Sequence, residues 1–169
     1  FGNTPDMFRE VEEELQSHPR RLYRLGTGEF TDSLLLDPWT GFSRDLIPFF
    51  ARRPIAVLEL KTKTYSVGCL DDLEHGGHTI VAWSLNAPEI RRREESRAAG
   101  IRDRLSAARY CAERGYWLAF HFDPMIHHEN WRQGYGETLD RLFDVVDPGR
   151  VVYLSLGAFR FMPELKAVI

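Results

Sequence analysis

The chain has 169 residues and a formal net charge of −3; 43% of its residues are hydrophobic and 28% are charged. This length fits a single domain, 1–169, and the composition is that of a globular protein with a sizeable core. The charge gives no overall attraction to nucleic acid, and no apolar run approaches the ~18 residues that a membrane helix needs. The two cysteines, Cys69 and Cys111, are far apart and indicate neither a disulfide framework nor a zinc knuckle. We therefore expect a reducing, cytoplasmic compartment and no membrane partner.

Helical and extended patterns alternate along the chain. In chain order we expect a helix over 6–17, a strand over 21–27, a helix over 43–52 with Ser43 as N-cap, and a strand over 55–63; then a short helix or turn over 66–75, a strand over 79–86, a helical stretch over 88–114 that breaks near 99–100, a strand over 116–124, a helix over 129–146 and a strand over 150–161. In the helix over 129–146 we expect Trp131, Tyr135, Leu139, Leu142 and Phe143 to face inward.

Strands separated by helices predict an α/β fold with a parallel sheet. The strands start roughly every 25–35 residues, which is the rhythm of a (β/α) barrel. A closed barrel of eight strands needs ~200–250 residues, so about five strands in this chain do not close one. The pattern leaves an open doubly wound sheet, a partial barrel, or part of a larger barrel.

Polar residues gather where each predicted strand ends. In parallel α/β folds, ligands bind at the carboxyl ends of the strands. The glycines at 26 and 28 would let a ligand approach the backbone closely. Glu29 after the first strand and Lys63 after the second suit a zwitterion, with the ligand's amine at Glu29 and its carboxylate at Lys63. The strand-end residues are Gly28, Glu29 and Thr31; Lys61, Thr62 and Lys63; Ser84 and Asn86; His121 and Asp123; and Ser155, Gly157 and Arg160.

The fourth strand allows other interpretations. Alternation places His121 and Asp123 on one face and Phe120 and Phe122 on the other, against helices. His121 and Asp123 form either a structural pair or, within "HFDPMIHH", two ligands of a metal hydrolase, but no further ligand is evident. We therefore assign no metal site. "GTGEFTDS" also lacks the GxxxxGK pattern of a phosphate-binding loop.

Five segments resemble successive blocks of the spore photoproduct lyase family, a DNA-repair-photolyase-like branch of the radical S-adenosylmethionine superfamily. They are "LYRLGTGEFTDSLLLDPWTG", "VLELKTKTYSV", "VAWSLNAPEIRRREE", "FHFDPMIHHENWRQGY" and "SLGAFRFMPELK", in order and at fitting spacing. The resemblance implies a partial (β/α) barrel of the TIM-barrel type, here with its first strand missing. It also implies a lyase in which a [4Fe-4S] iron–sulfur cluster cleaves S-adenosylmethionine to a radical, with DNA as the family's substrate.

The resemblance also implies roles for individual residues. The residues expected to bind the cofactor are Gly28 and Glu29, at the methionine amine; Thr31, near the methionyl group; Lys63 and Ser84, at the carboxylate and polar groups; and Asn86, at the ribose. His121, Asp123 and Arg160 are expected on the side of the barrel that faces the substrate.

Two departures from the family pattern limit what we expect of this chain. The CxxxCxxC cluster loop is absent, and Cys69 and Cys111 do not replace three closely spaced thiolates. The family's hydrogen-donating cysteine aligns with Glu29, which argues against repair of the thymine photoproduct. We therefore interpret the chain as an incomplete, cluster-less domain of a longer radical enzyme, with no tightly bound cofactor and no activity of its own. Self-association through the exposed barrel edge is also expected. The alternative is a degenerate, non-catalytic barrel that binds a nucleoside-like ligand or a partner protein.

Overall fold

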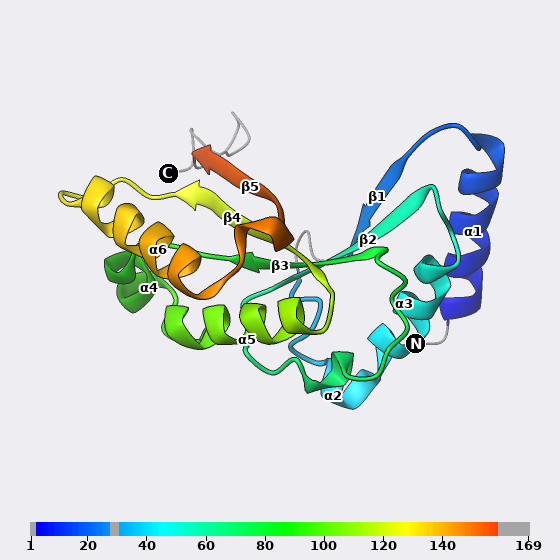
Figure 1. Cartoon of the computed structure of the whole chain (residues 1–169), viewed down its shortest axis with the longest axis horizontal. Coiled ribbons are helices and arrows are strands. Elements are labelled where there is room, and N and C mark those ends of the chain that lie inside the picture. The colour runs from blue at the N-terminus through cyan, green and yellow to red at the C-terminus, as the bar shows by residue number, and fades with distance from the viewer. Residues whose placement is uncertain (1–2, 28–30, 159–169) are drawn as a thin grey trace, which may run out of the picture.

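The computed structural model describes residues 3–27 and 31–158, which form one parallel sheet with helices along its outer side (Figure 1). The predicted Gly28, Glu29 and Arg160 lie outside the described residues. The helices are α1 (Thr4–Ser17), α2 (Asp37–Thr40), α3 (Phe42–Ala51), α4 (Pro88–Glu94), α5 (Ile101–Glu113) and α6 (Trp131–Val145), with 3-10 turns η1 (Gly68–Leu70) and η2 (Pro148–Arg150). The strands are β1 (Tyr23–Gly26), β2 (Ala56–Thr62), β3 (Thr79–Ser84), β4 (Trp117–Met125) and β5 (Val151–Ala158).

The sheet is parallel throughout and its order follows the chain, β1-β2-β3-β4-β5. A doubly wound sheet would reverse its strand order at a switch point, so that alternative is wrong. The sheet is instead a curled half-barrel, with β1 and β5 rising on opposite sides in Figure 1. The curl brings the two edge strands of this sheet into contact: the guanidinium carbon of Arg24 in β1 lies 4.6 Å from the ring centre of Tyr153 in β5. The predicted partial barrel of five parallel strands is thus confirmed.

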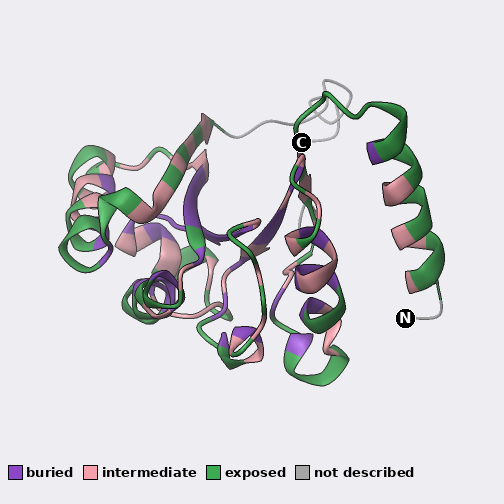
Figure 2. Ribbon diagram, turned by 45° about the vertical axis from the view of Figure 1, so that its right-hand side comes forward, coloured by how far each residue is buried: buried purple, intermediate pink, exposed green. Residues whose placement is uncertain are grey.

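The main core lies between the convex face of the sheet and the helices, where Figure 2 shows the strands as mostly buried. Phe120 and Phe122 are in this core, as the alternation of β4 predicts, and their burial contributes about 2 kcal/mol each. Trp83 of β3 is also fully buried, and its indole nitrogen donates to the carbonyl of Thr64 at 3.0 Å. A smaller apolar cluster of Ile80, Ala82 and Ala119 lies apart from the main core, with Val57 and Tyr153 packed against it.

Two details of the helices differ from the sequence prediction. Ser43 is not the N-cap of α3; Gly41 holds that position, with a φ of 62°, and the carboxylate of Asp37 accepts the backbone N–H of Ser43 at 2.9 Å. In α6, Tyr135 and Leu142 are buried as predicted, but Phe143 is 43% exposed. Successive helix positions turn by about 100°, so Phe143 points away from the face that Leu142 buries.

The break in the predicted helix at 88–114 is the feature that matters most for the site. α4 ends at Glu94 and α5 begins at Ile101, so residues 95–100 form a loop beside the end of β3. The loop is held by two arginine side chains: Arg91 donates to the carbonyl of Ala98 at 2.7 Å, and Arg104 donates to that of Ala99 at 3.0 Å. This loop carries Glu95 to the carboxyl ends of β2 and β3.

Candidate functional site

The segment after β1 is fastened to the end of β2 by Asp32. Its carboxylate accepts the backbone N–H groups of Leu34 and Leu35 at 3.0 and 2.9 Å. It also accepts the hydroxyl of Thr62 at 2.6 Å and the backbone N–H of Lys63 at 2.8 Å. Asp32 therefore fixes the backbone from which the Lys63 side chain projects.

Thr31 lies at the start of the same segment. Its hydroxyl donates to the carbonyl of Thr27 at 3.3 Å, and Thr27 in turn donates its hydroxyl to Ser33 at 2.8 Å. Ser33 exchanges hydrogen bonds with the backbone of Lys61. The predicted methionyl-side residue is therefore hydrogen-bonded to Thr27, next to the end of β1.

Lys63 and Asn86, predicted at the ends of β2 and β3, meet at a single carboxylate. The ammonium of Lys63 lies 2.6 Å from Oε1 of Glu95, and the side-chain amide of Asn86 donates to the same oxygen at 3.4 Å. Oδ1 of Asn86 accepts the hydroxyl of Tyr135 at 2.6 Å. Two of the predicted cofactor residues are thus brought together.

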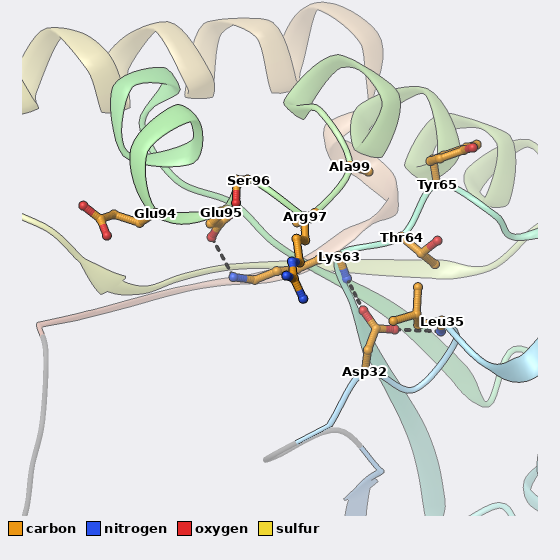
Figure 3. A pocket seen from close by; sticks show the side chains of 11 residues that line it. Asp32, Leu35, Lys63, Thr64, Tyr65, Glu94, Glu95, Ser96, Arg97 and Ala99 are labelled. Atoms are coloured by element: carbon orange, nitrogen blue, oxygen red, sulfur yellow. Dashed lines mark hydrogen bonds and ion pairs between the residues drawn. The ribbon is translucent and has the colours of Figure 1, made fainter.

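A pocket of about 490 Å³ opens beside Lys63, between the segments that follow β1 and β2 and the loop of residues 95–100 (Figure 3). Lys63, Tyr65, Glu95 and Arg97 are among the residues that line it. The pocket offers a ligand an ammonium, a guanidinium, an aromatic ring and the carboxylates of Asp32, Glu94 and Glu95, a combination suited to a zwitterionic, nucleoside-like ligand.

Ser84 takes part in the candidate site through its backbone carbonyl. The carbonyl of Ser84 accepts a hydrogen bond from Nη1 of the fully buried Arg104 at 2.7 Å. In the sheet, Ser84 pairs with His121 of β4, so the predicted cofactor residue and the predicted substrate-side residue are neighbours.

His121 belongs to a polar cluster on the concave face that extends from β1 to β5. Glu59 of β2 is its centre: Nε2 of His121 lies 3.3 Å from one of its oxygens, and Arg24 lies 3.4 Å from the other. The hydroxyl of Tyr153 donates to Glu59 at 2.6 Å and lies 3.1 Å from Nε2 of His121. Because Glu59 and His121 are both buried, this cluster lies in the interior of the barrel.

The electrostatics of the cluster keep Glu59 ionised. Burial raises the pKa of Glu59, but hydrogen bonds from His121 and Tyr153 and the nearby charge of Arg24 outweigh it, so the pKa lies below its usual range. Burial and the hydrogen bond to Glu59 raise the pKa of Tyr153. At neutral pH the pair is a carboxylate that accepts a hydrogen bond from a neutral phenol.

Asp123 lies two residues beyond His121, against β5. A methyl group in place of the hydrogen of Gly157 would lie 2.6 Å from Oδ1 of Asp123, so this position of the carboxylate requires glycine at 157. The predicted strand-end residues Asp123 and Gly157 are therefore in direct contact across β4 and β5.

Sequence reasoning missed Glu59, Glu95, Arg104 and Tyr153. Glu59 carried a signal, since a carboxylate inside the apolar segment "AVLEL" needs a buried partner. Glu95 and Arg104 lie in the charged stretch "RRREESRAAGIRDR", where no pattern distinguishes a buried charge from a solvated one. Tyr153 alternates with Val152 and Leu154, which identifies its face of the strand but not its partners.

The cysteines do not fit an iron–sulfur cluster. Burial raises the pKa of both Cys69 and Cys111 to about 12, so neither is a thiolate at neutral pH. Three thiolates are needed in the family's loop, and the chain has two cysteines. Residues 3–27 and 31–158 also hold no group of three His, Cys, Asp or Glu that could bind a metal ion. The metal-hydrolase interpretation of His121 and Asp123 therefore lacks a ligand set in this part of the chain.

A curled sheet of five parallel strands, with polar groups at the carboxyl ends and on the concave face, defines a partial (β/α)-barrel protein with a candidate ligand site at the strand ends. The profile of the spore photoproduct lyase family matches residues 1–169, and the chain belongs to this family.

Curated relatives and solved structures agree with this assignment. The spore photoproduct lyases of Geobacillus sp. (strain Y412MC61) and Bacillus subtilis (strain 168) are 28% and 26% identical over the whole chain and half of each relative. A mutant spore photoproduct lyase with bound AdoMet and dinucleoside spore photoproduct superposes with a TM-score of 0.90 at 27% identity, over 98% of this chain and 49% of that one. A second structure, a lyase complexed with dinucleoside spore photoproduct, gives a TM-score of 0.88 with the same coverage.

The chain spans about half the length of the curated relatives that it matches. In the part of the chain that the structure describes, no helix is both long and apolar enough to cross a membrane.

Proposed function

We propose that this chain is the S-adenosylmethionine-binding portion of a radical enzyme related to spore photoproduct lyase, acting on nucleic acid. Family membership and the match to a lyase with bound AdoMet support this proposal. The observation that carries it is the meeting of Lys63 and Asn86, from two strand ends, beside a pocket of about 490 Å³.

In this proposal the role of each residue follows from its place in the barrel. Lys63 and Ser84 hold the carboxylate and polar groups of the cofactor, Asn86 contacts the ribose, and Thr31 lies beside the methionyl chain. Gly28 and Glu29 are proposed at the methionine amine, on sequence grounds alone. His121 and Asp123 line the barrel interior on the side of the substrate, and Arg160 is proposed there from sequence.

The iron–sulfur cluster must come from outside these residues, because Cys69 and Cys111 do not fit one. When bound, the cluster supplies the electron that cleaves S-adenosylmethionine; this chain's own contribution is to bind and orient the cofactor. A cluster-less chain is therefore expected to bind S-adenosylmethionine weakly and to be inactive alone. Glu29 stands where the family has a hydrogen-donating cysteine, so we propose a nucleic-acid substrate other than the thymine photoproduct.

The binding proposal is tested by titrating the protein with S-adenosylmethionine in a calorimeter, with a Lys63→Gln variant beside it. We expect Lys63→Gln to weaken binding about tenfold or more, since a hydrogen bond to a charged group contributes roughly 1.5–3 kcal/mol. Arg109→Gln is the control, because Arg109 pairs with Glu113 at an exposed position of α5. Equal affinities of Lys63→Gln and the unsubstituted protein would contradict the assigned role of Lys63.

The alternative is a non-catalytic barrel that binds a nucleoside-like ligand or a partner protein. The coding sequence upstream of residue 1 distinguishes the two: a CxxxCxxC motif there supports the enzyme, and a start codon close to residue 1 supports the degenerate barrel.

We also propose that the isolated chain self-associates through a barrel edge. Edge strands present unpaired backbone groups, and the outer side of the edge strand β5 is apolar and exposed at Val152, Leu154 and Leu156.

A further inference from the structure

Glu95 contacts both residues that the proposed function places at the cofactor from neighbouring strand ends. It follows the last residue of α4, and its side chain is only 9% exposed. One oxygen, Oε1, lies 2.6 Å from the ammonium of Lys63 and 3.4 Å from the amide nitrogen of Asn86. Figure 3 shows Lys63 extending to Glu95 along the wall of the pocket.

The second oxygen of Glu95 is held by a buried arginine. Nη2 of Arg104 donates to Oε2 at 2.7 Å, and the Arg104 side chain has no exposed surface. The same guanidinium donates from Nη1 to Ser84 O and from Nε to Ala99 O. Three donors of one planar group are thus fixed to β3, to the loop of residues 95–100 and to Glu95, so the direction of the carboxylate is set.

Charge makes this arrangement suitable for an anionic ligand. Burial raises the pKa of Glu95, but hydrogen bonds from Lys63 and Arg104 outweigh it, and the pKa lies below its usual range. Glu95 between Lys63 and Arg104 leaves this triad a formal charge of about +1. Around it, Arg97 adds one positive charge to the pocket, and Asp32 and Glu94 add two negative ones. A lysine ammonium has three N–H donors, and the one directed at Glu95 leaves two for a ligand carboxylate.

We propose that Glu95, fixed by Arg104, is a positioning residue that presents the Lys63 ammonium to the carboxylate of S-adenosylmethionine. This inference rests on the proposed function. The competing interpretation is that the Glu95–Arg104 pair only anchors the loop of residues 95–100 to the sheet. The two differ in one respect: positioning acts on the ligand through Lys63, whereas anchoring does not depend on Lys63.

A double-mutant cycle separates these interpretations. The affinity for S-adenosylhomocysteine, which keeps the carboxylate, is measured by calorimetry for the unsubstituted protein, Glu95→Gln, Lys63→Gln and the double variant. We expect Glu95→Gln to weaken binding about tenfold, equivalent to about 1.4 kcal/mol, and to have no further effect once Lys63 is replaced. An equal loss in both backgrounds would overturn positioning in favour of anchoring. Glu113→Gln is the matched control, because it removes the exposed partner of Arg109 and leaves the pocket intact.

A second measurement needs no ligand. The rate at which an amine-reactive ester acylates Lys63 is followed by mass spectrometry, with Lys61 as the internal reference. We expect Lys63 to be protected by Glu95 and to react several-fold faster in Glu95→Gln. If Glu95→Gln fails to fold, Glu95→Asp keeps the charge but shortens the side chain, and intermediate protection is expected. Unchanged reactivity of Lys63 overturns the inference, whereas failure of the unsubstituted protein to bind the ligand overturns the proposed function instead.

Discussion

At the scale of single residues, the concave face is organised around one buried carboxylate. Glu59 receives contacts from three other strands: Arg24 of β1, His121 of β4 and Tyr153 of β5. A buried carboxylate is expensive without partners, and these contacts stabilise its charged form. The stability of the half-barrel should therefore depend on pH through the ionisation of Glu59.

We predict that Glu59→Gln destabilises the protein by about 1–3 kcal/mol at neutral pH, because polar partners of a charged group are left unsatisfied. The pKa of Glu59 is lower in the folded state than in the unfolded chain. Its stabilisation is therefore fully present above the unfolded value of ~4.3 and is lost as the pH falls through the folded pKa. Urea unfolding of both proteins across this range measures the difference, which should shrink with acidification. A difference that stays constant down to low pH would show that Glu59 contributes only by packing.

The residues of the candidate site differ in how far the sequence predicts them. Alternation along β4 is enough to place His121 opposite Phe120, and the burial of Phe120 and Phe122 confirms it. The partners of His121 could not be predicted, because its contacts with Glu59 and Tyr153 depend on the curl of the sheet. Lys63 and Asn86 are brought together as strand ends of a parallel sheet should be, but the carboxylate between them lies on a loop whose direction no periodicity encodes.

At the scale of elements, the order of the five strands and of the longer helices was predicted from the sequence, whereas the short helix α2 was not. The break between α4 and α5 coincides with Ala99-Gly100, and a glycine there weakens a continuous helix by roughly 0.5–1 kcal/mol relative to alanine. The capping of α3 was not predictable in the same way, because it depends on Asp37, which lies six residues before Ser43.

A pair of glycine substitutions tests how tightly β4 and β5 are packed at the site. Gly157→Ala would place its methyl group 2.6 Å from Oδ1 of Asp123, and we expect a loss of about 1–3 kcal/mol in the free energy of unfolding. Gly136→Ala in α6 meets no atom within 4 Å, so we expect a gain of about 0.5–1 kcal/mol from helix propensity. Thermal and denaturant unfolding of the two variants measure both values. Equal stabilities would indicate that Asp123 moves freely away from β5.

At the scale of the whole molecule, the half-barrel is open, and the sheet ends at two edge strands among the residues that the structure describes. β1 has four residues and is flanked by α1, which stacks Phe8 on Phe49 of α3 at 4.3 Å between ring centres. β5 has eight residues, and within residues 3–27 and 31–158 no helix covers its outer side, where Val152, Leu154 and Leu156 are 52%, 37% and 65% exposed. Of the two edge strands, β5 is therefore the one that exposes large apolar side chains.

This asymmetry predicts concentration-dependent association of the isolated chain through β5. Apolar surface contributes roughly 25 cal/mol per Å² when it is buried, so covering a leucine on each partner stabilises a contact measurably. Sedimentation equilibrium should show a mass above that of the monomer that rises with protein concentration. Leu156→Glu should weaken the association about tenfold or more, since it places a charge in the contact. Leu22→Glu is the control, because Leu22 is 80% exposed in the segment before β1. A monomeric mass at every concentration, or an equal effect of Leu22→Glu, would contradict association through β5.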